Sequence, residues 1–293
     1  MGALDDNVAV IVGGTSGIGA ATARLFALEG AAVVIAGRRT STGERLAAEI
    51  GPRATFCRAD VTVDGDLEAV MKDASTQFGR IDCLVNSAGG GGSAWGILDL
   101  RLDGLMQTLG VHVGGVAAAI HHAAPIMTEQ GTGSIINVAS AGGLRAGWSQ
   151  VDYSCAKAAV IHLTRCVAVE LGEAGIRVNS ISPGPILTGI FAKAAGVDPD
   201  EADRSAPSLE PVFAAQRSWR PLARVGVPGD VAAAALWLAS DASSLVTGHD
   251  VPVDGGLTVG PPASVLAATR AELIRTLLAA RGEGPTAALA SGS

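Results

Sequence analysis

The sequence predicts an α/β fold: a doubly wound, mainly parallel sheet flanked by helices in a single domain. Short apolar runs of the kind that form β-strands alternate with longer stretches rich in alanine and leucine, and this alternation implies right-handed crossovers between parallel strands. The chain of 293 residues is 48% hydrophobic and only 17% charged. This composition supplies the apolar residues that strands buried on both faces require.

Each expected strand is a short apolar run bounded by turn residues, and each expected helix is a longer run of helix-forming residues. We expect strands at residues 8–12, 32–36, 54–58, 83–86, 134–138, 177–182 and 250–253. We expect helices at residues 18–29, 42–50, 65–78, 102–127, 151–172 and 230–240.

Two segments do not follow this alternation. Residues 188–227 are rich in proline, alanine and charge and are too long for an ordinary connection, so we expect a functional lid there. After Pro261-Pro262 a helical pattern places apolar residues on one side, namely Leu266, Leu273, Ile274, Leu277 and Leu278. We therefore expect a domain over residues 1–260, which includes the lid, and a C-terminal helical extension with a flexible tail over residues 261–293.

The composition argues against several classes of partner. A net charge of −7 disfavours binding to nucleic acid or to an anionic membrane. The longest apolar run, residues 231–239, is half of the roughly 20 residues that a spanning helix needs. Asp5 and Asp6 stand where a secretion signal would be basic. Because the four cysteines are isolated and the histidines lack ligand spacing, we expect a cytoplasmic protein with neither disulfides nor a metal site.

A glycine-rich loop follows the first strand and opens the first helix. It reads Gly13-Gly14-Thr15-Ser16-Gly17-Ile18-Gly19. Gly13 permits a tight turn, and Gly17 and Gly19 let the backbone and the helix approach a pyrophosphate at the helix N-terminus. The strand–loop–helix context therefore predicts a Rossmann-type dinucleotide site. The alternative is an ordinary turn between a strand and a helix.

Tyr153 and Lys157 stand at i and i+4 in an expected helix, so their side chains share one face. Tyr153 is the only tyrosine in the chain, and Lys157 is one of three lysines. A phenol has a pKa of about 10, and a neighbouring cation should lower it enough for proton transfer. Ser140 ends the strand SIINVAS, at the sheet edge where ligands bind, and could hydrogen-bond a substrate oxygen. The alternative is a half-buried tyrosine, a solvated lysine and a turn serine.

These motifs, in this order, resemble those of the short-chain dehydrogenase/reductase family in its single-domain form with Tyr-x-x-x-Lys. The resemblance covers roughly residues 5–260. It also includes Asp60-Val61, Asn86-Ser87-Ala88-Gly89, Ser140, Pro183-Gly184 with Thr188, and Val246-Thr247-Gly248 followed by Val253-Asp254-Gly255-Gly256.

The resemblance implies an enzyme that transfers a hydride between NAD(P) and an alcohol or ketone, with Tyr153 moving the hydroxyl proton and Ser140 orienting the substrate. It implies that Asp60 and Val61 contact the adenine and that Lys157 binds the nicotinamide ribose. The full set of expected cofactor-binding residues is Gly13, Thr15, Ser16, Gly17, Ile18, Gly19, Arg38, Asp60, Val61, Asn86, Ala88, Gly89, Tyr153, Lys157, Pro183, Gly184, Ile186 and Thr188.

Three residues depart from the family pattern: Val12 replaces a threonine, Ser87 replaces an asparagine, and His112 replaces the asparagine of the catalytic tetrad. In the family that asparagine supports a water relay to the lysine. We expect His112 to take over this catalytic support and to lose it in acid, because imidazole gains a proton near pH 6.5. The competing interpretation is that the His112 side chain only fills space.

Other functions remain open at this point. A dinucleotide-binding sensor typically lacks the Tyr/Lys pair, and enoyl reductases usually space the two residues more widely. A 3-oxoacyl-[carrier protein] reductase would need a basic docking surface, whereas residues 128–132 read Thr-Glu-Gln-Gly-Thr. We therefore favour a small free alcohol or ketone.

Three tryptophans in the loops expected around the pocket, Trp95, Trp148 and Trp219, indicate an apolar or cyclic substrate; ordinary packing is the alternative. The flanking residues Gly142, Gly143, Leu144, Arg145 and Gln150 are candidates for setting specificity.

The end of the second strand bears on the choice of cofactor. Gly37 offers no carboxylate to the adenosine ribose, whereas Arg38 offers a guanidinium suited to a 2′-phosphate, so we expect NADP(H) to be favoured over NAD(H). The alternative is that Arg38 and Arg39 only solvate a loop. The family resemblance also implies a homo-oligomer, a tetramer, and we expect the leucine face after Pro262 to pack on the body or on a neighbouring subunit.

Overall fold

Seven parallel strands form one sheet in the order β3-β2-β1-β4-β5-β6-β7. The strands are β1 (Val8–Val12), β2 (Ala32–Gly37), β3 (Ala54–Arg58), β4 (Cys83–Asn86), β5 (Gly133–Val138), β6 (Ile176–Pro183) and β7 (Asp250–Val253). This computed structural model describes residues 2–93, 96–214 and 218–281. The strand order reverses between β1 and β4, the place where open α/β sheets bind ligands. The predicted doubly wound fold is confirmed.

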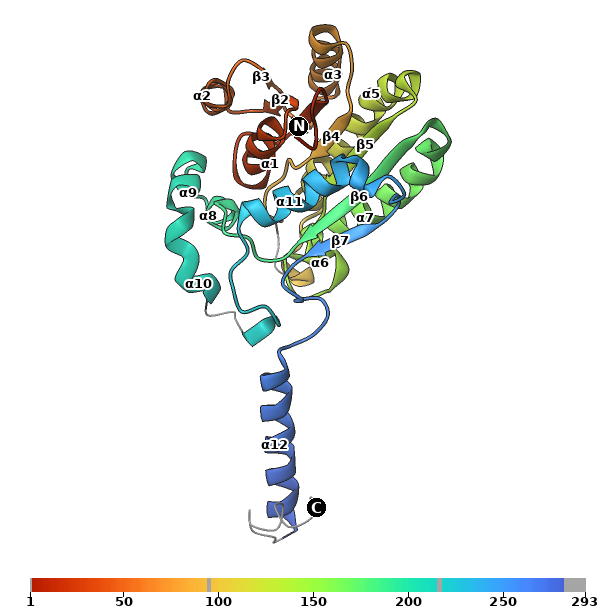
Figure 1. The fold of residues 1–293 in the computed structure, drawn as a ribbon. Coiled ribbons are helices and arrows are strands. Elements are labelled where there is room, and N and C mark those ends of the chain that lie inside the picture. The colour runs from red at the N-terminus through yellow and green to blue at the C-terminus, as the bar shows by residue number, and fades with distance from the viewer. Residues whose placement is uncertain (1, 94–95, 215–217, 282–293) are drawn as a thin grey trace.

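Helices cover both faces of the sheet (Figure 1). Alternate residues of β1 point to opposite faces, as the pleat of a strand requires. Val10 and Val12 pack with α3 (Asp64–Phe78), α5 (Gly115–Gln130) and α7 (Val151–Leu171). Ala9 and Ile11 pack with α1 (Gly17–Leu28), α2 (Thr40–Ile50) and α11 (Pro228–Ala239). Burial on both faces explains why the central strands are continuously apolar.

The predicted strands, and five of the six predicted helices, occur within two residues of the expected ends. The exception is the helix expected at residues 102–127. It consists of α4 (Leu102–Leu109), a π-helical turn (Gly110–Gly114) and α5, which continues to Gln130. Such π-helical turns are rare and occur frequently at functional sites.

The helical segment from Leu102 to Gln130 is long and apolar enough to cross a membrane by length and composition alone. We expected no such segment, because its scattered polar residues interrupt every apolar run. Packed helices of a protein core meet the same criteria. Ala119, Ala123 and Met127 of this segment are fully buried against the sheet, whereas Leu102 and Met106 at its start are exposed.

The segment expected to form a lid folds into short helices: α8 (Ile190–Ala194), α9 (Pro199–Ser205) and α10 (Glu210–Ala214). Its two ends are held together, because the backbone N–H of Leu187 donates to the carbonyl of Gly226 at 2.8 Å. The short helices lie along one side of the domain, the side that carries α1 and α2 (Figure 1). The segment therefore leaves the end of β6 and returns to it.

The C-terminal helix α12 (Ala263–Ala280) projects away from the rest of the domain (Figure 1). None of its residues is buried, and Leu266, Leu273, Ile274 and Leu277 are all exposed. The expectation that this face packs on the body of the same chain is therefore wrong. Packing on a neighbouring subunit stays a prediction.

Candidate active site

The glycine loop after β1 lies tightly against the end of β4. Gly13 has a φ of +80°, and a Cβ at this position would overlap the backbone of Ala88. Gly17 has a φ of +52°, and a Cβ on Gly19 would overlap the carbonyl group of Gly13. Only glycine adopts these φ values, or allows the backbone to come this close, without strain. The structure therefore requires glycine at each of these three positions.

The N-terminus of α1 is suited to an anion. Ser16 precedes this helix and makes no side-chain cap hydrogen bond to it. The first N–H groups of a helix lack intrahelical acceptors and carry partial positive charge. Together with the bare backbone around Gly17, they fit the pyrophosphate of a dinucleotide. Ser16, Ile18 and Gly19 would hold it through backbone N–H groups.

Val61, predicted to contact the adenine, and Asn86 and Ala88, predicted to line the cofactor channel, lie together around a closely packed gap beside β1 and β4. Its walls are formed by Val12, Val61, Asn86, Ala88, Val111, Gly115 and Val116. Asp60 precedes Val61, and its carboxylate accepts hydrogen bonds from the Thr62 backbone N–H and hydroxyl at 3.0 and 2.8 Å. These two bonds lower the pKa of Asp60, so its carboxylate stays ionised and is held in place beside Val61.

The chain after β6 closes the other side of the glycine loop. Gly184, which follows Pro183, leaves no room for a Cβ beside Asp254. Ile186 is buried. The γ-methyl of Thr188 would lie 3.3 Å from a Cβ on Gly17. Thr188 therefore faces the helix N-terminus suited to the pyrophosphate.

Ser140, Tyr153 and Lys157 lie together at the carboxyl end of β5. Ser140 caps the short helix α6 (Ala141–Leu144), its Oγ accepting from the Gly142 N–H at 3.1 Å, and hydrogen-bonds the Tyr153 side chain. Tyr153 and Lys157 occupy the same face of α7, with Lys157 Nζ 5.7 Å from the centre of the phenol ring. Lys157 is buried and donates to the carbonyl of Val138 at 2.7 Å.

Burial governs the ionisation of this group. It raises the pKa of Tyr153, and the hydrogen bond from Ser140 only partly opposes the rise. It lowers the pKa of Lys157 to about 8. The expectation of a lowered pKa for Tyr153 is therefore wrong, because loss of hydration outweighs the hydrogen bond with Ser140. The phenol keeps its proton at neutral pH and is ready to donate it.

His112 lies inside the π-helical turn and packs against Tyr153. The two rings meet edge to face with their centres 5.2 Å apart. Gly89 makes room for the imidazole, since a Cβ there would lie 2.6 Å from Cε1. His112 is buried, and its Nδ1 has no hydrogen-bond partner among the described residues. It is thus a neutral ring with an unused polar atom beside the phenol.

Burial, and then the charge of Lys157, lower the pKa of His112 to about 3. The expected loss of activity as His112 gains a proton near pH 6.5 is therefore wrong: the ring is neutral from about pH 4 upward.

We predict that His112→Asn and the wild type share the same acid limb in a pH–rate profile. His112→Leu should lower kcat about tenfold at every pH, because it removes the polar atoms of the imidazole. A tenfold loss corresponds to the free energy of about one buried hydrogen bond. Coincident profiles of wild type and both variants would show that the ring serves packing alone.

Asp152 is a residue of this site that the sequence interpretation missed. Its carboxylate is buried and accepts from the Ser93 N–H and hydroxyl, both at 2.6 Å, from the Thr108 hydroxyl at 2.8 Å and from the Tyr153 N–H at 2.9 Å. These bonds outweigh the cost of burial and lower its pKa to about 2. Asp152 thus ties α4 and the loop after β4 to the start of α7. An acidic residue in the first turn of a helix usually does no more than complement the helix dipole. For this reason Asp152 could not be recognised from the sequence as a residue of the site.

Two of the three tryptophans expected around the pocket lie together. Trp148 and Trp219 meet edge to face with ring centres 5.2 Å apart, and the Arg145 guanidinium lies 5.6 Å from the Trp148 ring. Trp95 lies outside the described residues. Residues from the loop after β5 and from the lid therefore form one aromatic cluster.

The other expected specificity residues divide into two groups. Leu144 and Arg145 are exposed beside the aromatic cluster, where they could meet a ligand. Gly143 instead touches the α7 backbone, since a Cβ would lie 2.7 Å from Lys157 C. Gln150 is buried and accepts from the Ser149 hydroxyl at 2.8 Å. Gly143 and Gln150 therefore support the catalytic helix.

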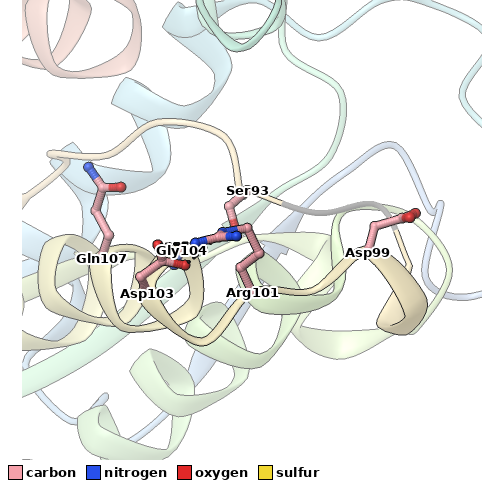
Figure 2. A pocket seen from close by; sticks show the side chains of 6 residues that line it. All are labelled: Ser93, Asp99, Arg101, Asp103, Gly104 and Gln107. Atoms are coloured by element: carbon pink, nitrogen blue, oxygen red, sulfur yellow. Dashed lines mark hydrogen bonds and ion pairs between the residues drawn. The ribbon is translucent and has the colours of Figure 1, made fainter.

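A cavity of about 200 Å³ opens away from these residues, on the outside of α4. Figure 2 shows its lining, which is Ser93, Asp99, Arg101, Asp103, Gly104 and Gln107. Arg101 is paired with Asp103 at 2.9 Å, and both side chains are largely exposed. The cavity is a surface hollow, and Ser93 connects it to the catalytic group through its hydrogen bond to Asp152.

Comparison with known proteins gives long matches. The family described as enoyl-(acyl carrier protein) reductase matches residues 12–258. Momilactone A synthase of Oryza sativa subsp. japonica is 39% identical over 86% of this chain and 90% of its own length. Cis-4-hydroxycyclohexanecarboxylate dehydrogenase of Sinomonas cyclohexanicum is 38% identical, with 87% and 98% covered. Mitochondrial borneol dehydrogenase of Lavandula x intermedia is 36% identical, with 87% and 92% covered.

Proposed function

Because the chain belongs to the short-chain dehydrogenase/reductase family and is an NAD(P)-dependent oxidoreductase that acts on CH–OH groups, we propose that it acts on a small, apolar, cyclic secondary alcohol or the corresponding ketone. The observation that carries this proposal is the buried group of Ser140, Tyr153 and Lys157. The aromatic cluster of Trp148 and Trp219 joins the loop between α6 and α7 to the lid.

Each residue of the group has one task in the proposed reaction. The nicotinamide, when bound, accepts or supplies the hydride. Tyr153 donates its proton to the ketone oxygen in reduction, or takes the hydroxyl proton in oxidation. Ser140 hydrogen-bonds the same oxygen and steadies its charge. Lys157 places a positive charge beside the phenol and would bind the nicotinamide ribose.

The substrate class rests on the aromatic cluster and on the relatives. Borneol and hydroxycyclohexanecarboxylate, which name two of the relatives, are cyclic alcohols. Flat aromatic walls such as Trp148 and Trp219 suit a ring, because they offer large apolar contact at little entropic cost.

The second candidate is reduction of a 3-oxoacyl-[carrier protein], against which residues 128–132 carry no cation for an acidic carrier. Enoyl reduction, which the matching family's description names, is disfavoured by the Tyr–Lys spacing of four residues.

We further propose a preference for NADP(H), with Arg38 binding the 2′-phosphate. Arg38 follows β2 and its side chain is 75% exposed, with Asp60 no closer than 4.0 Å. The structure leaves no room for an acidic side chain at position 37, because a Cβ on Gly37 would lie 2.8 Å from the γ-methyl of Thr15. A largely exposed guanidinium that makes only a long ion pair with Asp60, at 4.0 Å, is available to the phosphate.

A homotetramer is the proposed assembly. Exposed apolar side chains such as Leu102 and Met106 on α4, and the leucine face of α12, are surfaces of the kind that subunits bury. Light scattering of the intact protein checks this directly, and a monomer would refute it. Removal of residues 262–293 should weaken assembly while leaving cofactor binding intact.

A panel of cyclic and linear secondary alcohols and ketones, assayed with both cofactors, tests the function. We expect turnover of cyclic substrates, seen as a change in the absorbance of the reduced nicotinamide, and a higher kcat/KM with NADP(H). Turnover confined to acyl-carrier substrates would replace the proposal with the second candidate. Cofactor binding without turnover of any substrate would favour a sensor.

A further inference from the structure

Four charged side chains join the lid to the cofactor site, and we name Arg39, Lys193, Asp200 and Asp203 the lid clasp. Arg39 pairs with Asp200 at 2.6 Å and with Asp203 at 2.9 Å. Lys193 pairs with Asp203 at 2.7 Å and donates to the Ser16 hydroxyl at 3.2 Å. The clasp therefore connects α8 and α9 of the lid both to the glycine loop and to the loop after β2.

Arg39 occupies the region where this fold distinguishes the two cofactors. It lies two residues after Gly37, at the end of β2, where an arginine can accommodate a 2′-phosphate. Its side chain is only 23% exposed and is engaged by both lid carboxylates, in contrast to the exposed side chain of Arg38. Two adjacent arginines thus have different availability for a phosphate.

Both carboxylates of the clasp engage the guanidinium of Arg39, and Lys193 also pairs with Asp203. A 2′-phosphate carries close to two negative charges and competes with carboxylates for the same guanidinium donors. While Asp200 and Asp203 hold Arg39, that arginine is neutralised and its donors are not free to bind the phosphate. The hydroxyl of NAD carries no such charge and is unaffected.

We propose that Asp200 and Asp203 of the lid are specificity-determining residues that restrain NADP(H) binding by holding Arg39 away from the 2′-phosphate. This inference rests on the proposed use of NAD(P). It assigns part of the cofactor choice to residues some 160 positions away from β2 in the sequence, on a segment that also faces the substrate side.

The test compares dissociation constants for NADPH and NADH, measured by fluorescence titration without substrate. In Asp200→Asn/Asp203→Asn, the ratio Kd(NADPH)/Kd(NADH) should fall about tenfold, the scale of one freed charge-assisted contact. Loosening of the lid changes both constants alike, so the ratio isolates the phosphate. Asp200→Asn alone, at a half-exposed position, should shift the ratio less in the same direction.

Two further variants make the test specific. Glu201→Gln removes an equal charge from an exposed position on the same helix and should leave the ratio unchanged. In an Arg39→Gln background, the two asparagine substitutions should no longer change the ratio. An unchanged ratio in the double variant, or a change that persists without Arg39, overturns the inference. Failure of the wild type to bind either cofactor would instead refute the proposed function.

Discussion

Tyr153→Phe should lower kcat by roughly 10²–10⁴, the loss expected when a general acid/base is removed. The phenylalanine ring keeps the edge-to-face contact with His112 and the packing over Lys157, so the cofactor dissociation constant and the unfolding midpoint should stay close to wild type. Only the hydroxyl that Ser140 contacts is lost.

Steady-state kinetics in both directions, with Cys155→Ser as a control at an exposed position of the same helix, measure this effect. Because burial raises the pKa of Tyr153, the wild type should reduce ketones well at neutral pH, where the phenol holds a proton. Oxidation needs the ionised phenol, so its rate should climb as the pH rises. Turnover of Tyr153→Phe near the wild-type level would remove this residue from the mechanism.

Lys157→Met should lower kcat/KM by about 10²–10³, comparable to loss of one preorganised charge from an active site. The ammonium is buried, and burial lowers its pKa to about 8. A charge held out of water costs stability, so replacement by an apolar side chain of similar length should leave the unfolding midpoint unchanged or raise it. In this variant kcat/KM should therefore fall while the unfolding midpoint does not, which shows that the lysine serves catalysis and not folding.

The matched control is Lys72→Met, which removes the same charge from an exposed position on α3. In the wild type, ketone reduction should fall above about pH 8, as Lys157 loses its proton and its charge beside the phenol. That alkaline limb should be absent from the residual activity of Lys157→Met. A variant with unchanged kcat/KM and the same limb would show that another group titrates.

The sheet and most helices could be predicted because their signals are local. Strands such as Val8–Val12, buried on both faces, must be continuously apolar. The glycines at positions 13, 17 and 19 are recognised from their order in one strand–loop–helix stretch, although only Gly19 is required by a contact within that stretch, with Gly13. Tyr153 and Lys157 meet because a helix brings i and i+4 together. None of these inferences requires knowledge of distant parts of the chain.

Features set by tertiary contacts could not be predicted in this way. The buried side chain of Asp152 accepts hydrogen bonds from Ser93 and Thr108, and no regular spacing in the sequence links these residues to it. The pKa values of Tyr153 and His112 depend on how much water the fold excludes, and a sequence does not state that. The exposure of α12 likewise depends on whether another element packs against it, and the apolar pattern of the helix does not indicate this.

Tyr153 is the only tyrosine among 293 residues, and this has a practical consequence for spectroscopy. Biosynthetic incorporation of a fluorinated tyrosine would place one ¹⁹F nucleus in the whole protein, beside Lys157 and His112. Its single resonance would report proton loss from the phenol, arrival of a nicotinamide and movement of the lid without assignment or background. The reaction centre can therefore be observed by itself in a protein of ordinary size.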